Sequence, residues 1–296
     1  MNRKAQDKLI VAAIVGIIAI ILVFALLYNF YTSTKEKLAI QDCKNSIAAH
    51  SVLMGATGRE VITDIKCPTR DIVVANDKED AAKRQIADDM QRCWYEWNKG
   101  DGTYFKGDGV FCHICSTYIF KNPQKNVNGF IQYLAETPIA HTYAGDTPGV
   151  SYQDYFQGFK TPKSATAIKN ANIQDLTKVD YIDASKEYTT IFVYASSKDA
   201  VDKAVEGGGR TTLATAGMFG VIGGGLAVTI GLASNPAGWI IGGVLVAGTG
   251  VAAIWKALDI TPPEVVSFIV FRPYDADQLK AIGCEKSQVN EQSHTG

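Results

Sequence analysis

Residues 211–255 contain no Asp, Glu, Lys or Arg, and this uncharged stretch limits the folds open to the chain more than any other feature. It is too long for a single membrane span, which needs about 20 apolar residues. A Ser-Asn-Pro-Ala-Gly turn at residues 234–238 divides it, because proline removes a backbone donor and glycine relaxes the backbone. We therefore expect a transmembrane helical hairpin, with helices at Leu213–Leu232 and residues 238–256.

Small residues recur at every third or fourth position along the two arms of this expected hairpin. Such spacing places them on one face of each helix, where they let two backbones approach closely in lipid. The stripe would either pack the arms within one chain, or form an interface between copies or the wall of a pore. The expected packing residues are Gly217, Gly220, Gly224, Ala227 and Gly231 in the first arm, and Gly243, Ala247 and Gly250 in the second.

The N-terminal region predicts a further transmembrane helix at residues 9–31. Residues 1–8 are basic, and the apolar run that follows is longer than the core of a signal peptide and has no small-residue cleavage site. By the positive-inside rule, residues 1–8 are expected in the cytoplasm. An alternative is that Arg3-Lys4-Ala5-Gln6 resembles the processing site of archaeal pilin-type precursors.

The expected fold class is a membrane protein with an extracytoplasmic α+β domain between the first span and the Gly-rich hairpin. This domain comprises residues 32–210, joined by a C-terminal strand and helix in residues 257–296. A helix is expected at Glu79–Trp97, capped by Asp77 or Asp80, because apolar residues recur on one of its faces. We expect the strand Val265–Phe271 to pair with the strand Tyr188–Tyr194.

All six cysteines fall outside the expected spans, on the extracytoplasmic side. An even number of cysteines in an oxidising compartment predicts disulfide bonds, although six cysteines allow 15 pairings. A bridge from the last cysteine to the main domain would fasten the two parts across the hairpin. The disulfide candidates are Cys43, Cys67, Cys93, Cys112, Cys115 and Cys284.

The motif Cys112-His113-Ile114-Cys115 has three interpretations. The two cysteines could join separate structural disulfides, bind zinc together with Cys93 or another cysteine, or form a redox-active dithiol. A redox Cys-x-x-Cys opens a helix, whereas the sequence that follows here is typical of a strand. This context favours separate disulfides.

Residues 85–120 contain a helix that ends in Cys93-Trp94, then a glycine-rich turn, then the Cys-x-x-Cys strand. This pattern resembles uncharacterised membrane proteins of small-genome archaea. The resemblance covers about an eighth of the chain. It implies a plasma-membrane protein with a disulfide-bearing outer domain, and it implies no activity.

Known catalytic and cofactor motifs are absent from the sequence, so we expect no catalytic residue, cofactor or metal ligand. The four histidines, His50, His113, His141 and His294, do not form a metal-binding motif. Asp88 and Asp89 are expected to be solvated on the polar face of their helix. A net charge of −1 gives no basis for nucleic-acid binding.

These observations favour a membrane-anchored structural or interaction protein of the cell surface over an enzyme. Its expected partners are the lipid bilayer and further copies of itself, forming a homo-oligomer through the small-residue hairpin, with an extracellular protein partner as a further option. The alternatives are a pore-forming or channel-like assembly and, less favoured, a surface thiol oxidoreductase.

Overall fold

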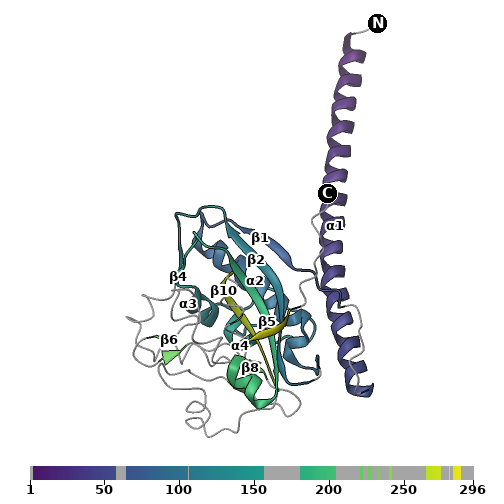
Figure 1. Ribbon diagram of the computed structural model, residues 1–296. Coiled ribbons are helices and arrows are strands. Elements are labelled where there is room, and N and C mark those ends of the chain that lie inside the picture. The colour runs from purple at the N-terminus through teal and green to yellow at the C-terminus, as the bar shows by residue number, and fades with distance from the viewer. Residues whose placement is uncertain are drawn as a thin grey trace. The chain divides into compact units, whose positions relative to one another are not determined.

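The computed structural model describes residues 3–57, 65–105, 107–156, 181–204, 265–274 and 283–287, with residue 280 and four two-residue strands between 221 and 241. The chain forms two compact units, Met1–Asp42 and Cys43–Gly296. The second unit contains a mixed β-sheet with helices packed against it (Figure 1).

The helices are α1 (Arg3–Thr57), α2 (Glu79–Glu96), α3 (Phe130–Glu136) and α4 (Tyr152–Phe156), with the short 3-10 helix η1 (Asn98–Gly100). Residues 198–204 are also helical. The strands are β1 (Arg70–Val74), β2 (Gly109–Phe120), β3 (Val127–Asn128), β4 (Tyr181–Ile182), β5 (Tyr188–Ser196), β6 (Val221–Ile222), β7 (Leu226–Ala227), β8 (Leu232–Ala233), β9 (Ile240–Ile241), β10 (Val265–Pro273) and β11 (Cys284–Ser287).

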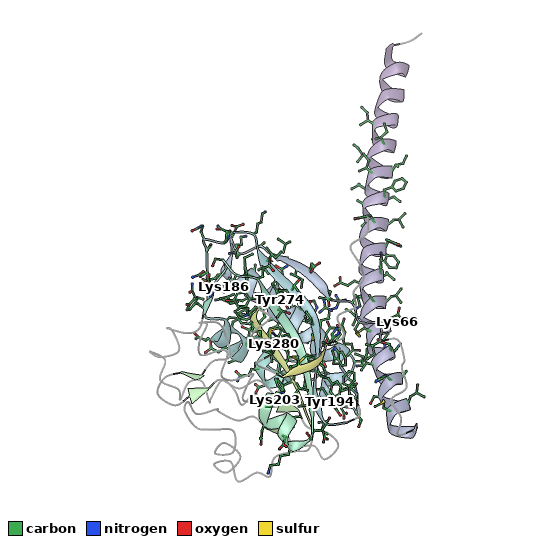
Figure 2. All side chains as sticks on the ribbon, viewed as in Figure 1. Lys66, Lys186, Tyr194, Lys203, Tyr274 and Lys280 are labelled. Atoms are coloured by element: carbon green, nitrogen blue, oxygen red, sulfur yellow. A yellow bond between two sulfur atoms is a disulfide. The ribbon has the colours of Figure 1, made fainter. Side chains whose placement is uncertain are left out.

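α1 contains the apolar run that was expected to be the first membrane span. Its large apolar side chains between Ile14 and Tyr31 are 51–72% exposed, and side chains project from all sides of the helix (Figure 2). Among the residues that the structure describes, no helix combines the length and apolarity needed to cross a membrane. The prediction of a transmembrane helix at residues 9–31 is therefore wrong, although the helical conformation is confirmed. The apolar run is one part of a 55-residue helix that continues into polar sequence.

The described residues of the uncharged stretch form short strands, β6 to β9. The predicted helices at Leu213–Leu232 and 238–256 are therefore wrong at these residues. β8 pairs with β10 and β9 pairs with β8, while β6 pairs with β7. Sheet pairing satisfies backbone groups as a helix does, and a helix loses roughly 1 kcal/mol for each glycine. Of the expected packing residues, Ala227 lies in β7. The others lie outside the described residues: Gly217, Gly220, Gly224, Gly231, Gly243, Ala247 and Gly250.

The main sheet has seven strands among the described residues, in the order β1-β2-β5-β10-β8-β9, with β11 also paired to β2. β2 pairs antiparallel with β5, and its other edge pairs in parallel with β1 and β11. β10 pairs antiparallel with β5 from Val265 opposite Ser196 to Pro273 opposite Tyr188. This confirms the predicted pairing of the C-terminal strand with the main domain.

α2 packs on one face of the sheet through the apolar residues that the sequence predicts. They are buried in the larger core cluster: Ile86, Met90, Cys93, Trp94 and Trp97. The predicted cap is wrong, because the N-cap residue is Lys78 and no side chain caps the helix. On the opposite face, a smaller cluster includes Val201 of the 198–204 helix and Val193 of β5.

Within the second unit, the end of α1 is fastened to the domain at several points. Cys43 forms a disulfide with Cys67, and the Ser46 hydroxyl accepts a hydrogen bond from the Lys66 amide at 3.0 Å. His50 Nε2 lies 2.7 Å from the carbonyl oxygen of Tyr104. These contacts span two turns of the helix, so they fix its rotation as well as its position.

Gly100 occupies a position that only glycine fits, and this gives a testable prediction. Its φ is +73°, and an added Cβ would lie 2.7 Å from Trp94 Cη2 and 2.8 Å from Ser267 Cβ. We expect Gly100→Ala to lower the free energy of unfolding by about 2–4 kcal/mol, measured by urea denaturation. Gly107→Ala is the matched control, because Gly107 has a φ of +88° with nothing within 4 Å of the added Cβ.

Gly107→Ala should cost only the backbone term of about 1 kcal/mol. Equal losses for the two variants would mean that the contacts with Trp94 and Ser267 do not matter.

Candidate functional site

All six cysteines are joined in three disulfides, which confirms the prediction of disulfide bonds. The pairs are Cys43–Cys67, Cys93–Cys115 and Cys112–Cys284, with Cα–Cα distances of 4.7, 5.9 and 5.5 Å. These distances lie within the range that disulfide geometry allows. The last pair fastens β11 to β2, as the sequence predicts for Cys284.

The two cysteines of the Cys-x-x-Cys motif belong to different disulfides. Residues three apart in a strand point to opposite faces of the sheet, so Cys112 and Cys115 cannot easily pair with each other. Cys115 reaches α2 through Cys93, whereas Cys112 reaches β11 through Cys284. The interpretation as separate structural disulfides is confirmed, and neither sulfur is available as a zinc ligand or an attacking thiolate.

A β-bulge in β2 lets Tyr118, three residues after Cys115, lie in the same core cluster as Cys115. The register with β5 shifts between Ile114 and Ser116, so Cys115 is the extra residue. Side-chain hydroxyls satisfy the carbonyl groups on either side. Thr69 Oγ1 donates to the Ile114 oxygen at 2.7 Å, and Thr189 Oγ1 donates to the Ser116 oxygen at 2.9 Å.

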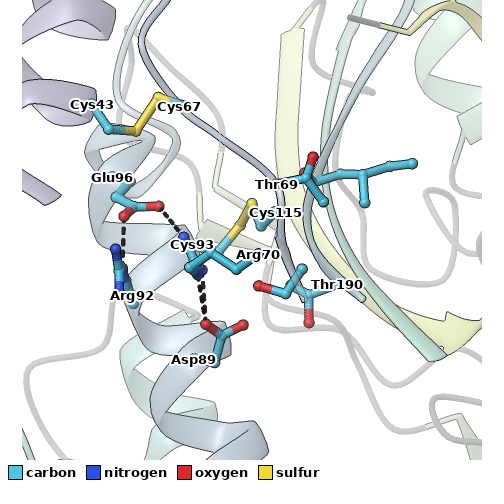
Figure 3. Close-up of a disulfide and its surroundings, with 12 residues drawn as sticks. Cys43, Cys67, Thr69, Arg70, Asp89, Arg92, Cys93, Glu96, Cys115 and Thr190 are labelled. Carbon is cyan, nitrogen blue, oxygen red and sulfur yellow. Dashed lines mark hydrogen bonds and ion pairs between the residues drawn. A yellow bond between two sulfur atoms is a disulfide. The ribbon is translucent and has the colours of Figure 1, made fainter. Parts of the chain in front are cut away.

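Beside the Cys93–Cys115 disulfide lies a buried ion network between β1 and α2 (Figure 3). Arg70 Nη2 lies 2.9 Å from Asp89 Oδ1, and Arg70 Nη1 lies 3.0 Å from Glu96 Oε2. Arg92 Nε lies 2.8 Å from Glu96 Oε1. Two guanidinium groups therefore balance two carboxylates.

Tyr118 of β2 extends the network into the core of the domain. Its hydroxyl donates to Asp89 Oδ2 at 2.6 Å and lies 2.7 Å from Thr190 Oγ1, which can donate to it in turn. Burial, followed by the charge of Asp89, raises the pKa of Tyr118, so the phenol stays protonated.

The electrostatics favour a closed, fully charged network. Burial alone would lower the pKa of Arg70, but Asp89 and Glu96 outweigh burial and raise it. Each of the four charged groups thus has an opposite partner. The arrangement positions α2 on β1 and β2.

The prediction that Asp88 and Asp89 are solvated is wrong for Asp89. Asp89 is buried in the network, while Asp88 is half-buried and accepts a hydrogen bond from the Tyr152 hydroxyl. The sequence gives little indication that Arg70 pairs with Asp89, because Arg70 lies 19 residues earlier and in a different element.

The described histidines lie in three separate places. His50 contacts Tyr104, and His113 is buried against Trp97 with 5.2 Å between ring centroids. His141 is exposed, with Nε2 3.6 Å from Asp88 Oδ2. Since every cysteine is oxidised, His141 has no thiol to activate. His294 lies outside the described residues.

No protein-family model, no curated protein and no solved structure matches this chain. The resemblance of residues 85–120 to archaeal membrane proteins stays a prediction.

The ion network predicts a large effect for a small change at Asp89. Asp89→Asn removes one of the two carboxylates that face buried Arg70. We expect a loss of about 2–4 kcal/mol in the free energy of unfolding, because a largely buried guanidinium loses one of its two partners. Asp80→Asn is the control, since the Asp80 side chain is 90% exposed and lies 3.5 Å from Lys83. The control should cost less than about 1 kcal/mol.

His113 predicts a specific pH dependence of stability. Burial, with a smaller contribution from Arg70, lowers its pKa from 6.5 to about 4. Between these values the unfolded chain binds the proton and the folded chain does not, so stability falls as the pH falls from 6.5 to about 4. The component from His113 is up to about 3 kcal/mol.

His113→Phe should flatten this part of a stability–pH profile, while His141→Gln, which changes an exposed ring, should leave it in place. An unchanged slope in His113→Phe would show that other groups cause the pH dependence.

Proposed function

We propose that this is a structural or interaction protein whose disulfide-stabilised domain works outside the reducing cytoplasm, at a lipid membrane. The observation that carries the proposal is the combination of three disulfides with a long apolar surface on α1.

The disulfides support an oxidising compartment. They involve every cysteine, and one of them joins Cys112 to Cys284, which are 172 residues apart. Disulfides of this kind persist in extracellular, periplasmic or similar compartments and are rare where glutathione keeps thiols reduced. A thiol oxidoreductase would need a free or exchanging cysteine, so the disulfides favour a structural role.

The apolar surface of α1 supports lipid as the partner. Ile20, Ile21, Leu22 and Val23 are consecutive, and each is more than half exposed. Successive residues of a helix turn by about 100°, so four of them cover all sides. A partner helix would cover only one stripe, so this extended apolar surface favours lipid as the partner.

The pore-forming alternative depended on a helical hairpin at residues 213–232 and 238–256. The strands β6 to β9 within these ranges remove the observation on which it rested. Assembly into a homo-oligomer and binding of an extracellular protein remain predictions.

Liposome flotation tests the proposed partner. We expect the full chain to float with neutral phosphatidylcholine vesicles, and the double variant Ile17→Glu/Ile21→Glu to lose most of this binding, because charges in an apolar phase are costly. Val52→Glu is the matched control, since Val52 lies on the same helix and is 69% exposed, but belongs to the second unit.

The control should float like the wild type. Recovery of the wild-type chain in the lipid-free fraction, or equal flotation of all three proteins, would contradict the proposal.

A further inference from the structure

A second charged cluster is formed where four segments of the second unit converge. α1 contributes Lys44, α2 contributes Tyr95, η1 contributes Lys99, and the loop before α4 contributes Tyr143 and Asp146. Unlike the first network, this cluster holds two ammonium groups and one carboxylate.

Lys99 reaches the cluster through a strained turn. Asn98 and Lys99 have φ values of 49° and 57°, although neither is glycine, and such conformations cost roughly 1–2 kcal/mol per residue. The Asn98 side chain steadies the turn by donating to the Asp101 oxygen at 2.6 Å. The result places Lys99 Nζ 2.6 Å from Asp146 Oδ1, with the Lys99 side chain still one-third exposed.

Asp146 is held in place by its own loop. Its Oδ2 accepts a hydrogen bond from the Tyr143 amide at 2.8 Å, and its side chain is fully buried. Tyr155 of α4 closes the other side of the cluster, with Lys99 Nζ 5.3 Å from the centre of its ring. The carboxylate is therefore a fixed counter-charge for Lys99.

Lys44 rests on an aromatic face. Its Nζ lies 3.6 Å from the centre of the Tyr95 ring, and Tyr143 stacks on Tyr95 with 4.1 Å between ring centres. The neighbouring Cys43–Cys67 disulfide fixes this part of α1. The Lys44 ammonium is thus held at the rim of the cluster and is only partly buried.

The charges in the cluster do not cancel. Among the described residues, no carboxylate lies within ion-pair distance of Lys44, and Asp146 is already paired with Lys99. Burial, then repulsion from Lys99, lowers the pKa of Lys44, while Asp146 opposes this change. An anion placed between the two ammonium groups would relieve their repulsion and balance the second positive charge.

We propose that Lys44 and Lys99 form a binding site for an oxyanion, a phosphate or carboxylate group of a ligand, with Lys44 positioned by the stacked rings of Tyr95 and Tyr143. The two ammonium groups supply charge-assisted hydrogen bonds to the anion. The Tyr95 ring carries Lys44 on one face and Tyr143 on the other, so the stack holds Lys44 in place at the site. The site requires neither lipid nor a partner chain.

The test is calorimetric titration of the full chain in nonionic detergent at low salt, with inorganic phosphate in one arm and glucuronate in the other. We expect saturable binding of at least one probe, and a fall of about tenfold or more in affinity for Lys44→Met and for Lys99→Met. Lys121→Met is the control, because Lys121 is exposed at the end of β2. Binding of phosphate alone assigns a phosphorylated ligand, and binding of glucuronate alone assigns an acidic sugar.

A second measurement uses only the wild-type chain, so it stands even if a variant fails to fold. Acetic anhydride labelling, followed by mass spectrometry, should show that the bound probe slows acetylation of Lys44 and Lys99, but not of Lys121. Equal labelling with and without both probes, or unchanged affinity in both lysine variants, would overturn the proposed site.

Discussion

The attachment of α2 to β2 is the constraint on which the rest of the domain depends. Cys93–Cys115 joins the two elements covalently, and Arg70 of β1 joins the same helix through Asp89 and Glu96. The bulge at Cys115 makes both contacts compatible, because it shifts the alternation of β2 so that Tyr118 also faces the helix and bonds Asp89. A disulfide alone fixes one point, whereas the ion pairs at Asp89 and Glu96 extend the attachment over two turns of α2.

Periodicity and cysteine chemistry predicted much of this arrangement from the sequence. Local patterns predicted three features: the apolar face of α2, the pairing of β10 with β5 and the bridge from Cys284. Each prediction needed only the residue pattern of the individual segments. The buried position of Asp89 was not predicted in this way, because a carboxylate at a polar helical position is normally solvated. Its burial depends on Arg70, a residue of another element, which no local pattern connects to it.

The uncharged stretch shows a different limit of sequence reasoning. Both lipid and a protein sheet favour apolar residues without charges, so composition alone does not separate a membrane helix from buried strands. The pairing of β8 with β10 decides for strands at Leu232–Ala233, since it supplies hydrogen-bond partners from a strand more than 30 residues away. Small residues at helical spacing are equally compatible with close packing in a sheet. In a helix, the same glycines would be destabilising.

The two charged clusters of the domain differ in how their charges balance, and this difference separates stability from recognition. Around Arg70 every charge is paired and largely shielded from solvent, so the cluster holds elements together. Around Lys99 the chain accepts a left-handed turn, yet the cluster retains one positive charge more than its carboxylate balances. Strain that leaves a charge uncompensated does not add stability by itself. An anion bound to Lys44 and Lys99 would balance the extra positive charge. This is the physical reason to regard the cluster as a binding site of the domain.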